Sequence, residues 1–126
     1  MGTTVSALIV ARAGALRDAL EALISTVPPI NQVEVMDENE NIFQKIPLIK
    51  PSMIILEANP PDHSKAGCLK ALKERFPDIP CILIVEEIYQ ERSSDFSRAD
   101  AVILEGSPPE ELIGLIQHHL HPVRSD

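Results

Sequence analysis

The stretch Pro51-Ser-Met-Ile-Ile-Leu-Glu-Ala-Asn-Pro-Pro61 decides how the chain can fold. Residues 53–56 are all apolar, which is typical of a central parallel strand whose two faces are both covered. Glu57 follows directly, at the carboxyl end of the predicted strand, where open α/β sheets place their ligand sites. A second interpretation is that Glu57 only marks where the strand reaches water, and both stay open at this point.

Four further segments have the composition of strands. Residues 5–10, 80–85 and 101–104 are almost wholly apolar, whereas residues 32–36 alternate apolar and polar side chains, as an outer strand does. Helical segments lie between these strands, so strand and helix alternate along the chain. This alternation predicts a parallel sheet with helices on both faces and right-handed crossovers.

The first two helices are predicted from apolar spacing and from prolines. The first has apolar residues three and four positions apart and should end at Pro28-Pro29, because proline cannot continue the hydrogen-bond ladder. Its apolar residues are Leu16, Ala19, Leu20, Leu23, Ile24 and Val27. A short helix around Ile42, Phe43 and Ile46 should be limited by Pro47 and Pro51.

The later helices are predicted from their N-terminal residues. Ser64 is a candidate N-cap for a helix that turns Leu69, Leu72 and Phe76 inward. Ser107-Pro-Pro-Glu110 has the pattern of a capping box with proline at the first helical position. The helix that follows should bury Leu112, Ile113, Ile116 and Leu120. Residues 88–97 are weakly patterned, and we expect a short or mobile helix there.

Composition narrows the range of functions. The chain has 126 residues, of which 44% are hydrophobic, enough for one domain with its own core. Its net charge of -8 argues against a nucleic-acid surface, which needs clustered Lys and Arg. No apolar run approaches the length of a membrane span, and no export signal is present, so we expect a cytoplasmic protein.

The cysteines and histidines suggest no redox or metal chemistry. Cys68 and Cys81 lie in apolar segments and are predicted to be reduced core thiols. His118, His119 and His121 resemble a metal cluster only superficially, because no second ligand group is predicted beside them. We interpret them as a solvated helix end.

Three stretches together resemble the receiver domains of response regulators, which have the flavodoxin-like fold. Residues 51–61 resemble the family's third strand and following loop, residues 76–84 the start of its fourth strand, and residues 98–112 its fifth strand and last helix. The resemblance implies a doubly wound, five-stranded parallel sheet in the order 2-1-3-4-5, with helices on both faces. It implies one receiver-like domain over residues 1–126, with residues 121–126 as a polar tail or the start of a linker.

This chain departs from the family's phosphorylation residues. Family members bind Mg²⁺ with an acidic pair after the first strand, accept phosphate on an aspartate after the third, and place a hydroxyl after the fourth, an aromatic residue in the fifth and a lysine after it. In the same order, this chain has Ala11 and Arg12, Glu57, Val85, Val102 and Glu105. Since alanine and arginine supply no oxygen ligand, the resemblance predicts no metal, no cofactor and no phosphorylation of Glu57. Its carboxylate could imitate phosphate only crudely.

Charge balance predicts a role for Arg12. In the implied strand order the first and third strands are neighbours, so Arg12 and Glu57 leave the sheet at the same edge. Without a cation, Glu57, Glu86 and Glu105 would repel one another there. We expect the Arg12 guanidinium to reach toward Glu57, with Glu86 or Glu105 as a second partner, and the alternative, an Arg12 side chain that points into water, stays open.

The leading functional hypothesis is a phosphorylation-independent, receiver-like signalling domain. It would act as a protein-interaction or dimerisation module through its last strand and last helix, in two-component signalling or transcription regulation, with a C-terminal output domain beyond this chain. One alternative is a small enzyme that uses Glu57, Glu86 and Glu105 as acid-base groups, although no Gly-rich phosphate loop or nucleophile elbow is present. The other is a flavin-binding domain, which the single Tyr and the absence of Trp disfavour.

Overall fold

The computed structural model describes residues 5–37, 41–57, 63–85 and 99–120. Strands and helices alternate through most of this range, as the sequence predicts. The elements are β1 (Ser6–Val10), α1 (Ala15–Ile24), β2 (Gln32–Met36), α2 (Ile42–Ile49), β3 (Met53–Glu57), α3 (His63–Arg75), β4 (Cys81–Val85), β5 (Ala101–Leu104) and α4 (Pro109–His119). The weakly patterned residues 88–97 lie outside the described ranges.

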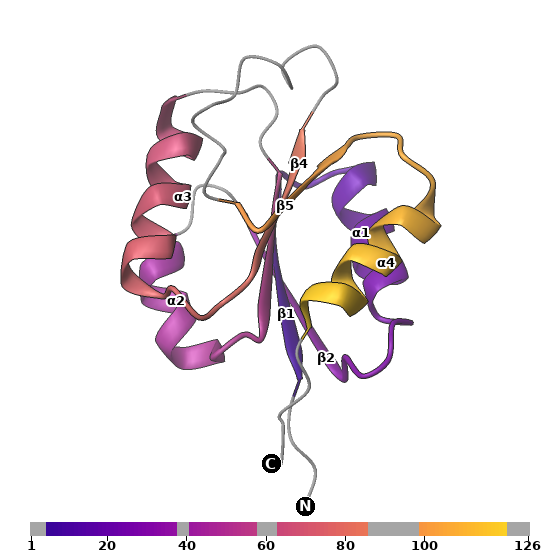
Figure 1. Ribbon diagram of the computed structural model, residues 1–126, viewed down its shortest axis with the longest axis horizontal. Helices are drawn as coiled ribbons and strands as arrows, with labels where there is room; N and C mark the ends of the chain where they lie inside the picture. Colours follow the sequence, from indigo (N-terminus) through magenta and orange to yellow (C-terminus); the bar gives the residue numbers. More distant parts are fainter. Residues whose placement is uncertain (1–4, 38–40, 58–62, 86–98, 121–126) are drawn as a thin grey trace, which may run out of the picture.

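The five strands form one parallel sheet in the order β2-β1-β3-β4-β5, which confirms the order implied by the resemblance. Figure 1 shows α1 and α4 on one face of the sheet and α2 and α3 on the other. Val10 at the end of β1 pairs with Met36 of β2 and with Leu56 of β3. The carboxyl ends of these three strands therefore meet at one edge of the sheet, where Glu57 is placed.

Two apolar cores hold the layers together. One lies between the sheet and α1 with α4, and the other lies between the sheet and α2 with α3. Alternate residues of each central strand point into different cores: Ile55 faces the first, and Ile54 and Leu56 face the second. All five residues of β3 are buried, as expected for a central strand, and each fully buried Leu or Ile side chain contributes about 1.5–3 kcal/mol.

Helix α1 ends before the proline pair that was expected to stop it. Its last residue is Ile24, and the Ser25 and Thr26 hydroxyls each donate a 2.6 Å hydrogen bond to a carbonyl oxygen of the last turn. The amides of Thr26 and Val27 bond three residues back, so the turn tightens there. Pro28 has no N–H to donate to the Ile24 carbonyl four residues earlier, so the proline pair bars any further turn, as predicted, while the two hydroxyl bonds and the tightened turn close the helix just before it.

Helix α2 corrects the prediction that Pro47 would limit it. Pro47 lies inside the helix, with its ring exposed, while Ile42 and Ile46 are buried. Burial of these two side chains therefore offsets the hydrogen bond that proline cannot make. The last helical residue is Ile49, and its C-cap, Lys50, adopts the left-handed conformation (φ 52°) just before Pro51.

The starts of the last two helices also differ from prediction. Ser107 is not the N-cap of α4; Pro108 holds that position, Pro109 is the first helical residue, and no side chain caps the helix. The Ser107 amide donates to Leu104 O at 3.1 Å, which keeps this residue in the preceding turn. Ser64 lies inside α3, one residue after its first residue, so it is not the N-cap either. None of the helices in the described ranges could cross a membrane, since none is long and apolar enough.

Candidate functional site

Glu57 lies at the carboxyl end of β3 and is buried, with 6% of its surface exposed. Its Oε1 atom accepts a hydrogen bond of 3.1 Å from the main-chain amide of Arg12, the second residue after β1. A buried carboxylate needs such a donor, because burying it without a hydrogen-bond partner costs on the order of several kcal/mol of folding free energy. The chain thus uses Glu57 to hold the loop after β1 against the end of β3.

Arg12 contacts Glu57 differently from the prediction. The donor is the main chain of Arg12, and its side chain is exposed. Among the described residues, no ion pair joins its guanidinium to Glu57 or Glu105. Glu86 lies outside the described residues, so a pair with that carboxylate stays a prediction. For Glu57, a main-chain amide takes the place that we assigned to the guanidinium, because it already points at the strand end.

Ala11 completes the attachment of this loop. It is fully buried, and its amide donates to Met36 O at 3.2 Å. Successive amides of Ala11 and Arg12 therefore bond to β2 on one side and to β3 on the other. The loop is held by main-chain hydrogen bonds where the resembled family binds a metal.

The described residues of this edge do not fit a Mg²⁺ ion. Mg²⁺ needs several oxygen ligands in octahedral geometry, and the side chains of Ala11 and Arg12 offer none. Glu57 offers a carboxylate, with one oxygen already bonded to the Arg12 amide. In the part of the chain that the structure describes, no three acidic, His or Cys side chains are grouped as metal ligands.

The other degenerate positions lie on β4, β5 and the turn that follows. Val85 is fully buried at the end of β4, and its carbonyl accepts the Glu105 amide at 2.7 Å. Val102 on β5 is 36% exposed, and the Glu105 side chain is exposed as well. Val85 can offer a ligand only van der Waals contact, so it supplies no hydroxyl for a phosphate.

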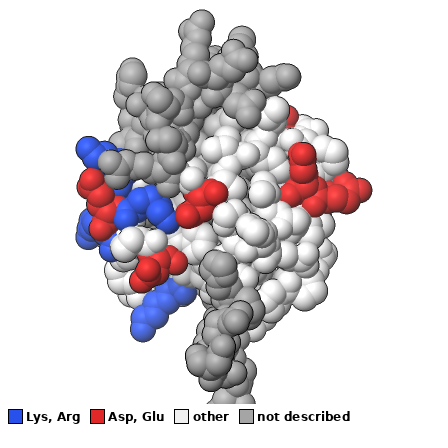
Figure 2. Space-filling model, viewed as in Figure 1, with Lys and Arg blue, Asp and Glu red and all other residues white. Residues whose placement is uncertain are grey.

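A shallow groove lies between β5 and α4, on the face predicted to bind a partner. Its lining combines apolar side chains with acidic ones: Val102, Ile103, Leu104, Ser107, Glu110, Glu111, Gly114 and Leu115. Figure 2 shows a broad uncharged surface on the side of the molecule that carries β5, with acidic side chains at its margin. Exposed apolar surface bordered by charge is typical of protein-binding faces.

A more closed pocket separates α1 from α4. It measures about 120 Å³ and is lined mainly by leucine and isoleucine, with Glu105, Gly106 and Ser107 at one side. Small-molecule sites usually occupy about 300–1,000 Å³. This pocket is therefore too small for a cofactor such as a flavin.

The histidine and cysteine predictions are partly covered by the described residues. The rings of His118 and His119 meet edge to face with centroids 4.9 Å apart in the last turn of α4. His121 lies outside the described residues. Cys81 is confirmed as a buried free thiol, and the Cys68 side chain is not described.

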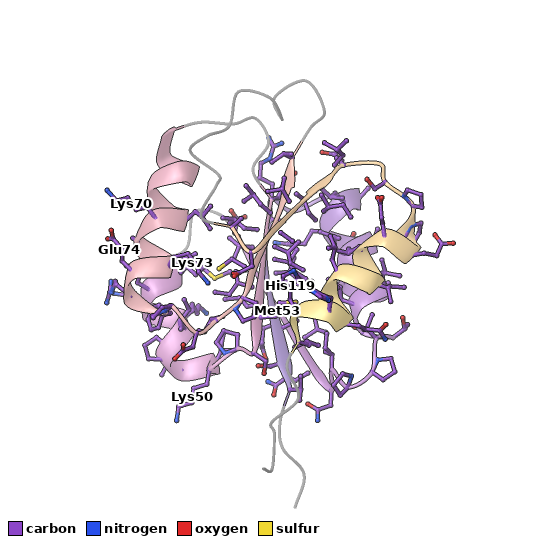
Figure 3. All side chains as sticks on the ribbon, viewed as in Figure 1. Lys50, Met53, Lys70, Lys73, Glu74 and His119 are labelled. Atoms are coloured by element: carbon purple, nitrogen blue, oxygen red, sulfur yellow. The ribbon has the colours of Figure 1, made fainter. Side chains whose placement is uncertain are left out.

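Sequence reasoning missed a polar cluster at the amino ends of the strands, opposite the end that carries Glu57. Asp100, just before β5, accepts hydrogen bonds from the Lys73 ammonium at 2.9 Å and from the Cys81 amide at 2.8 Å. Lys73 also donates to the carbonyl oxygens of Ile79 and Pro77 at 3.0 and 3.3 Å. In Figure 3, Lys73 points from α3 toward the sheet, whereas Lys70 and Glu74 point away from it.

The pKa of Asp100 reflects this cluster. Burial of the carboxyl group opposes its ionisation, but the hydrogen bonds from Lys73 and Cys81 and the positive charges of Lys73 and His119 outweigh that effect. The pKa of Asp100 therefore lies below its usual value of 3.8. Sequence analysis did not connect these residues, because Lys73 and Asp100 are 27 positions apart.

Comparison with known proteins identifies the fold but no sequence family. No family model matches the sequence, and no curated protein does. Among solved structures, a chemotaxis response regulator of Vibrio cholerae is 18% identical, with a TM-score of 0.77 over 94% of this chain and 100% of that one. A response regulator of Thermotoga maritima in complex with Mg²⁺ and BeF is also 18% identical, with a TM-score of 0.75 over 93% and 100% of the two chains.

A third similar structure belongs to a protein that, unlike the first two, is not described as a response regulator. A CheY-like protein (tadZ) of Pseudomonas aeruginosa is 16% identical, with a TM-score of 0.72 over 89% of this chain and 98% of that one. At these identities the likeness concerns the fold alone. The resemblance to receiver domains, and with it the flavodoxin-like fold, is confirmed at that level.

Proposed function

We propose that this chain is a receiver-like signalling domain that works without phosphorylation and acts by binding another protein. The receiver fold supports the signalling part of this proposal, because the solved structures of the same fold include response regulators. Fold alone does not determine function, so the argument depends on the site.

The observation that carries the proposal is the buried contact between Glu57 and the Arg12 amide. Phosphoryl transfer depends on positioning and on a metal that neutralises the developing charge. At the corresponding edge of this sheet, the carboxylate is engaged with the main chain, and the neighbouring Ala11 and Arg12 side chains cannot bind a cation. This contact holds the loop with protein groups alone, which supports a domain that needs no bound ligand at this edge.

The groove between β5 and α4 is the proposed binding surface. It presents Val102 and Leu115 for apolar contact and Glu110 and Glu111 for charge. Acidic side chains in the first turn of a helix are favoured by its dipole, so these two carboxylates are stable where they stand. The partner should therefore present an apolar side chain flanked by basic ones; an output domain, a separate protein or a second copy would each qualify.

The test is a titration of the protein with Mg²⁺ and then with beryllofluoride, followed through amide NMR shifts. We expect no saturable shifts, since a ligand without differential contacts moves no equilibrium. A control variant carrying Ala11→Asp, Arg12→Asp and Glu57→Asp restores the acidic residues and should gain Mg²⁺-dependent shifts. Saturable binding by the unaltered protein would reject phosphorylation independence.

The two alternative functions gain less support from the described residues. An enzyme using Glu57, Glu86 and Glu105 would need Glu57 available to a substrate, and its Oε1 is bonded to the main chain. The pocket between α1 and α4 is too small for a flavin, and the groove between β5 and α4 has no aromatic side chain among its lining residues to stack on the ring system. A colourless purified protein would dispose of the flavin alternative.

A further inference from the structure

Two large apolar side chains are exposed among the described residues, and they lie near opposite edges of the sheet. Leu48 on α2 is 81% exposed, and Val102 on β5 is 36% exposed. Strand β2, beside α2, forms one edge of the sheet, and β5 forms the other. Exposed apolar side chains at two separate places raise the question of whether one surface fits the other.

Leu48 is largely exposed at the side of a shallow hollow between α2 and β2, and two lysines line the same hollow. We call it the Leu48 surface; with Leu48 it comprises Gln32, Glu34, Lys45, Ile49 and Lys50. Glu34 accepts a hydrogen bond of 2.9 Å from Gln32 of the same strand, so it is already partly engaged. The two lysines leave this surface with a net positive charge on a chain whose total charge is -8.

The groove between β5 and α4 has the opposite character. Its walls include the apolar side chains Val102 and Leu115, and its charged groups are Glu110 and Glu111. Gly114 leaves room in the groove, since a Cβ placed there would meet no atom within 4 Å. The groove is therefore lined by apolar and acidic side chains, with open space over Gly114.

Charge decides how two copies can pair through these surfaces. A symmetric pair through the groove would bring four carboxylates together, from Glu110 and Glu111 of each copy, and a pair through the Leu48 surface would bring four lysines together. Like charges facing each other across an interface cost several kcal/mol. A groove facing the Leu48 surface of another copy instead places lysines against glutamates.

Relying on the proposed role of the groove in binding, we infer that its partner is the Leu48 surface of a second copy of this chain. Leu48 of one copy inserts beside Val102 and Leu115 of the next, and Lys45 and Lys50 face Glu110 and Glu111. Such a contact is head to tail. The copy at one end of the assembly therefore keeps an unused groove, and the copy at the other end keeps an unused Leu48 surface. Association therefore continues into longer chains unless the rotation between copies closes a ring.

Sedimentation velocity over a concentration series tests this inference with single-surface variants. The average mass of the unaltered protein should rise above the 13.9 kDa of one chain as concentration increases. Leu48→Asp and Val102→Asp should each stay monomeric at the same concentrations. Because each variant keeps one intact surface, an equimolar mixture should form a one-to-one dimer and nothing larger.

Matched controls separate a surface effect from an added charge. Gln44→Asp on α2 and Gln117→Asp on α4 introduce the same charge at exposed positions outside both surfaces, and they should assemble like the unaltered protein. Circular dichroism should show that all four variants fold. Added salt should weaken the assembly, since exposed charge pairs are screened within about 10 Å at 0.1 M.

Each other outcome overturns the head-to-tail contact and bears separately on the binding groove. A mixture that stays monomeric refutes the inference. A dimer that survives Leu48→Asp but not Val102→Asp refutes it too, and supports symmetric pairing through the groove. An unaltered protein that stays monomeric throughout also refutes it, and the Mg²⁺ titration then tests the proposed function independently.

Discussion

Two carboxylates, Glu57 at the carboxyl ends of the strands and Asp100 at their amino ends, are held in different ways. Glu57 and Asp100 each accept a main-chain amide from a neighbouring strand region, Arg12 at 3.1 Å and Cys81 at 2.8 Å. Asp100 also binds the Lys73 ammonium, whereas the described residues give Glu57 no cation. Asp100 is thus held by an amide and an ammonium together, whereas the described residues give Glu57 an amide alone.

The Asp100 cluster joins three parts of the chain that meet at the amino edge of the sheet. Lys73 belongs to α3, Ile79 to the loop before β4, and Asp100 to the residues before β5. The Lys73 ammonium donates to groups in the other two parts, so the end of α3 is tied to the starts of β4 and β5. At the carboxyl edge, the loop after β1 is held by the two amides of Ala11 and Arg12.

Asp100→Ala should be the most destabilising of the changes we consider. It removes the acceptor of the Cys81 amide and the carboxylate that pairs with Lys73, which together should lower the free energy of unfolding by about 2 kcal/mol. Urea denaturation measures this change. Asp78→Ala, at an exposed aspartate in the same loop region, is the control and should cost less than about 0.5 kcal/mol. Equal losses would mean that the cluster contributes nothing.

Glu57→Ala should cost less, about 1 kcal/mol. It removes the acceptor of the Arg12 amide, but it also relieves the desolvation of a charge that is 6% exposed. Glu57→Gln keeps an acceptor oxygen without the charge, and should leave the free energy of unfolding nearly unchanged. If Gln proves as costly as Ala, the charge itself stabilises the fold, and the contrast with Asp100 disappears.

Acid should destabilise the protein in part through Asp100. We expect this effect on the free energy of unfolding to be smaller than that of Glu57→Ala. Because its pKa in the folded state is lowered below 3.8, its stabilising contribution is present above that pH and is lost as pH falls through the folded value. The side chain is one-third exposed, so solvent screens part of the effect. Between about pH 5 and pH 2, the midpoint of urea unfolding should fall less for Asp100→Asn than for the unaltered protein. An unchanged fall would assign the acid sensitivity to other groups.

The fold could be predicted from the sequence because its strongest signals are local. The apolar runs of β1, β3 and β4 admit few interpretations, and the alternation in residues 32–36 correctly marked β2 as an edge strand. Helix ends were less predictable. Pro47 stays inside α2 because burial of Ile42 and Ile46 outweighs one missing hydrogen bond, and such a balance depends on tertiary contacts.

The sequence predicted which residues meet at the candidate site better than it predicted which of their atoms make contact. Parallel strand order places Arg12 beside Glu57, as the structure shows, but sequence carries no direct record of which Arg12 group would point there. Side-chain charge suggested the guanidinium, and main-chain geometry supplied the amide. The Asp100 cluster was missed for a related reason: Asp100 lies in one of the stretches that carry the resemblance, but nothing in the sequence shows that its side chain meets Lys73, 27 positions away.

The smallest expected effect is the coupling between Arg12 and Glu57, and it separates the two ways of holding a carboxylate. Arg12→Ala changes only the side chain, so the amide that donates to Glu57 stays in place. The loss in unfolding free energy should therefore be the same in the unaltered background and in Glu57→Gln, with a difference below about 0.3 kcal/mol. Lys73→Met measured with and without Asp100→Asn is the matched cycle, and there we expect a coupling of about 0.5–1 kcal/mol, because the side-chain charges themselves are in contact. A coupling of that size at Arg12 would show that its guanidinium reaches Glu57 in solution, and the two edges would then hold their carboxylates in the same way.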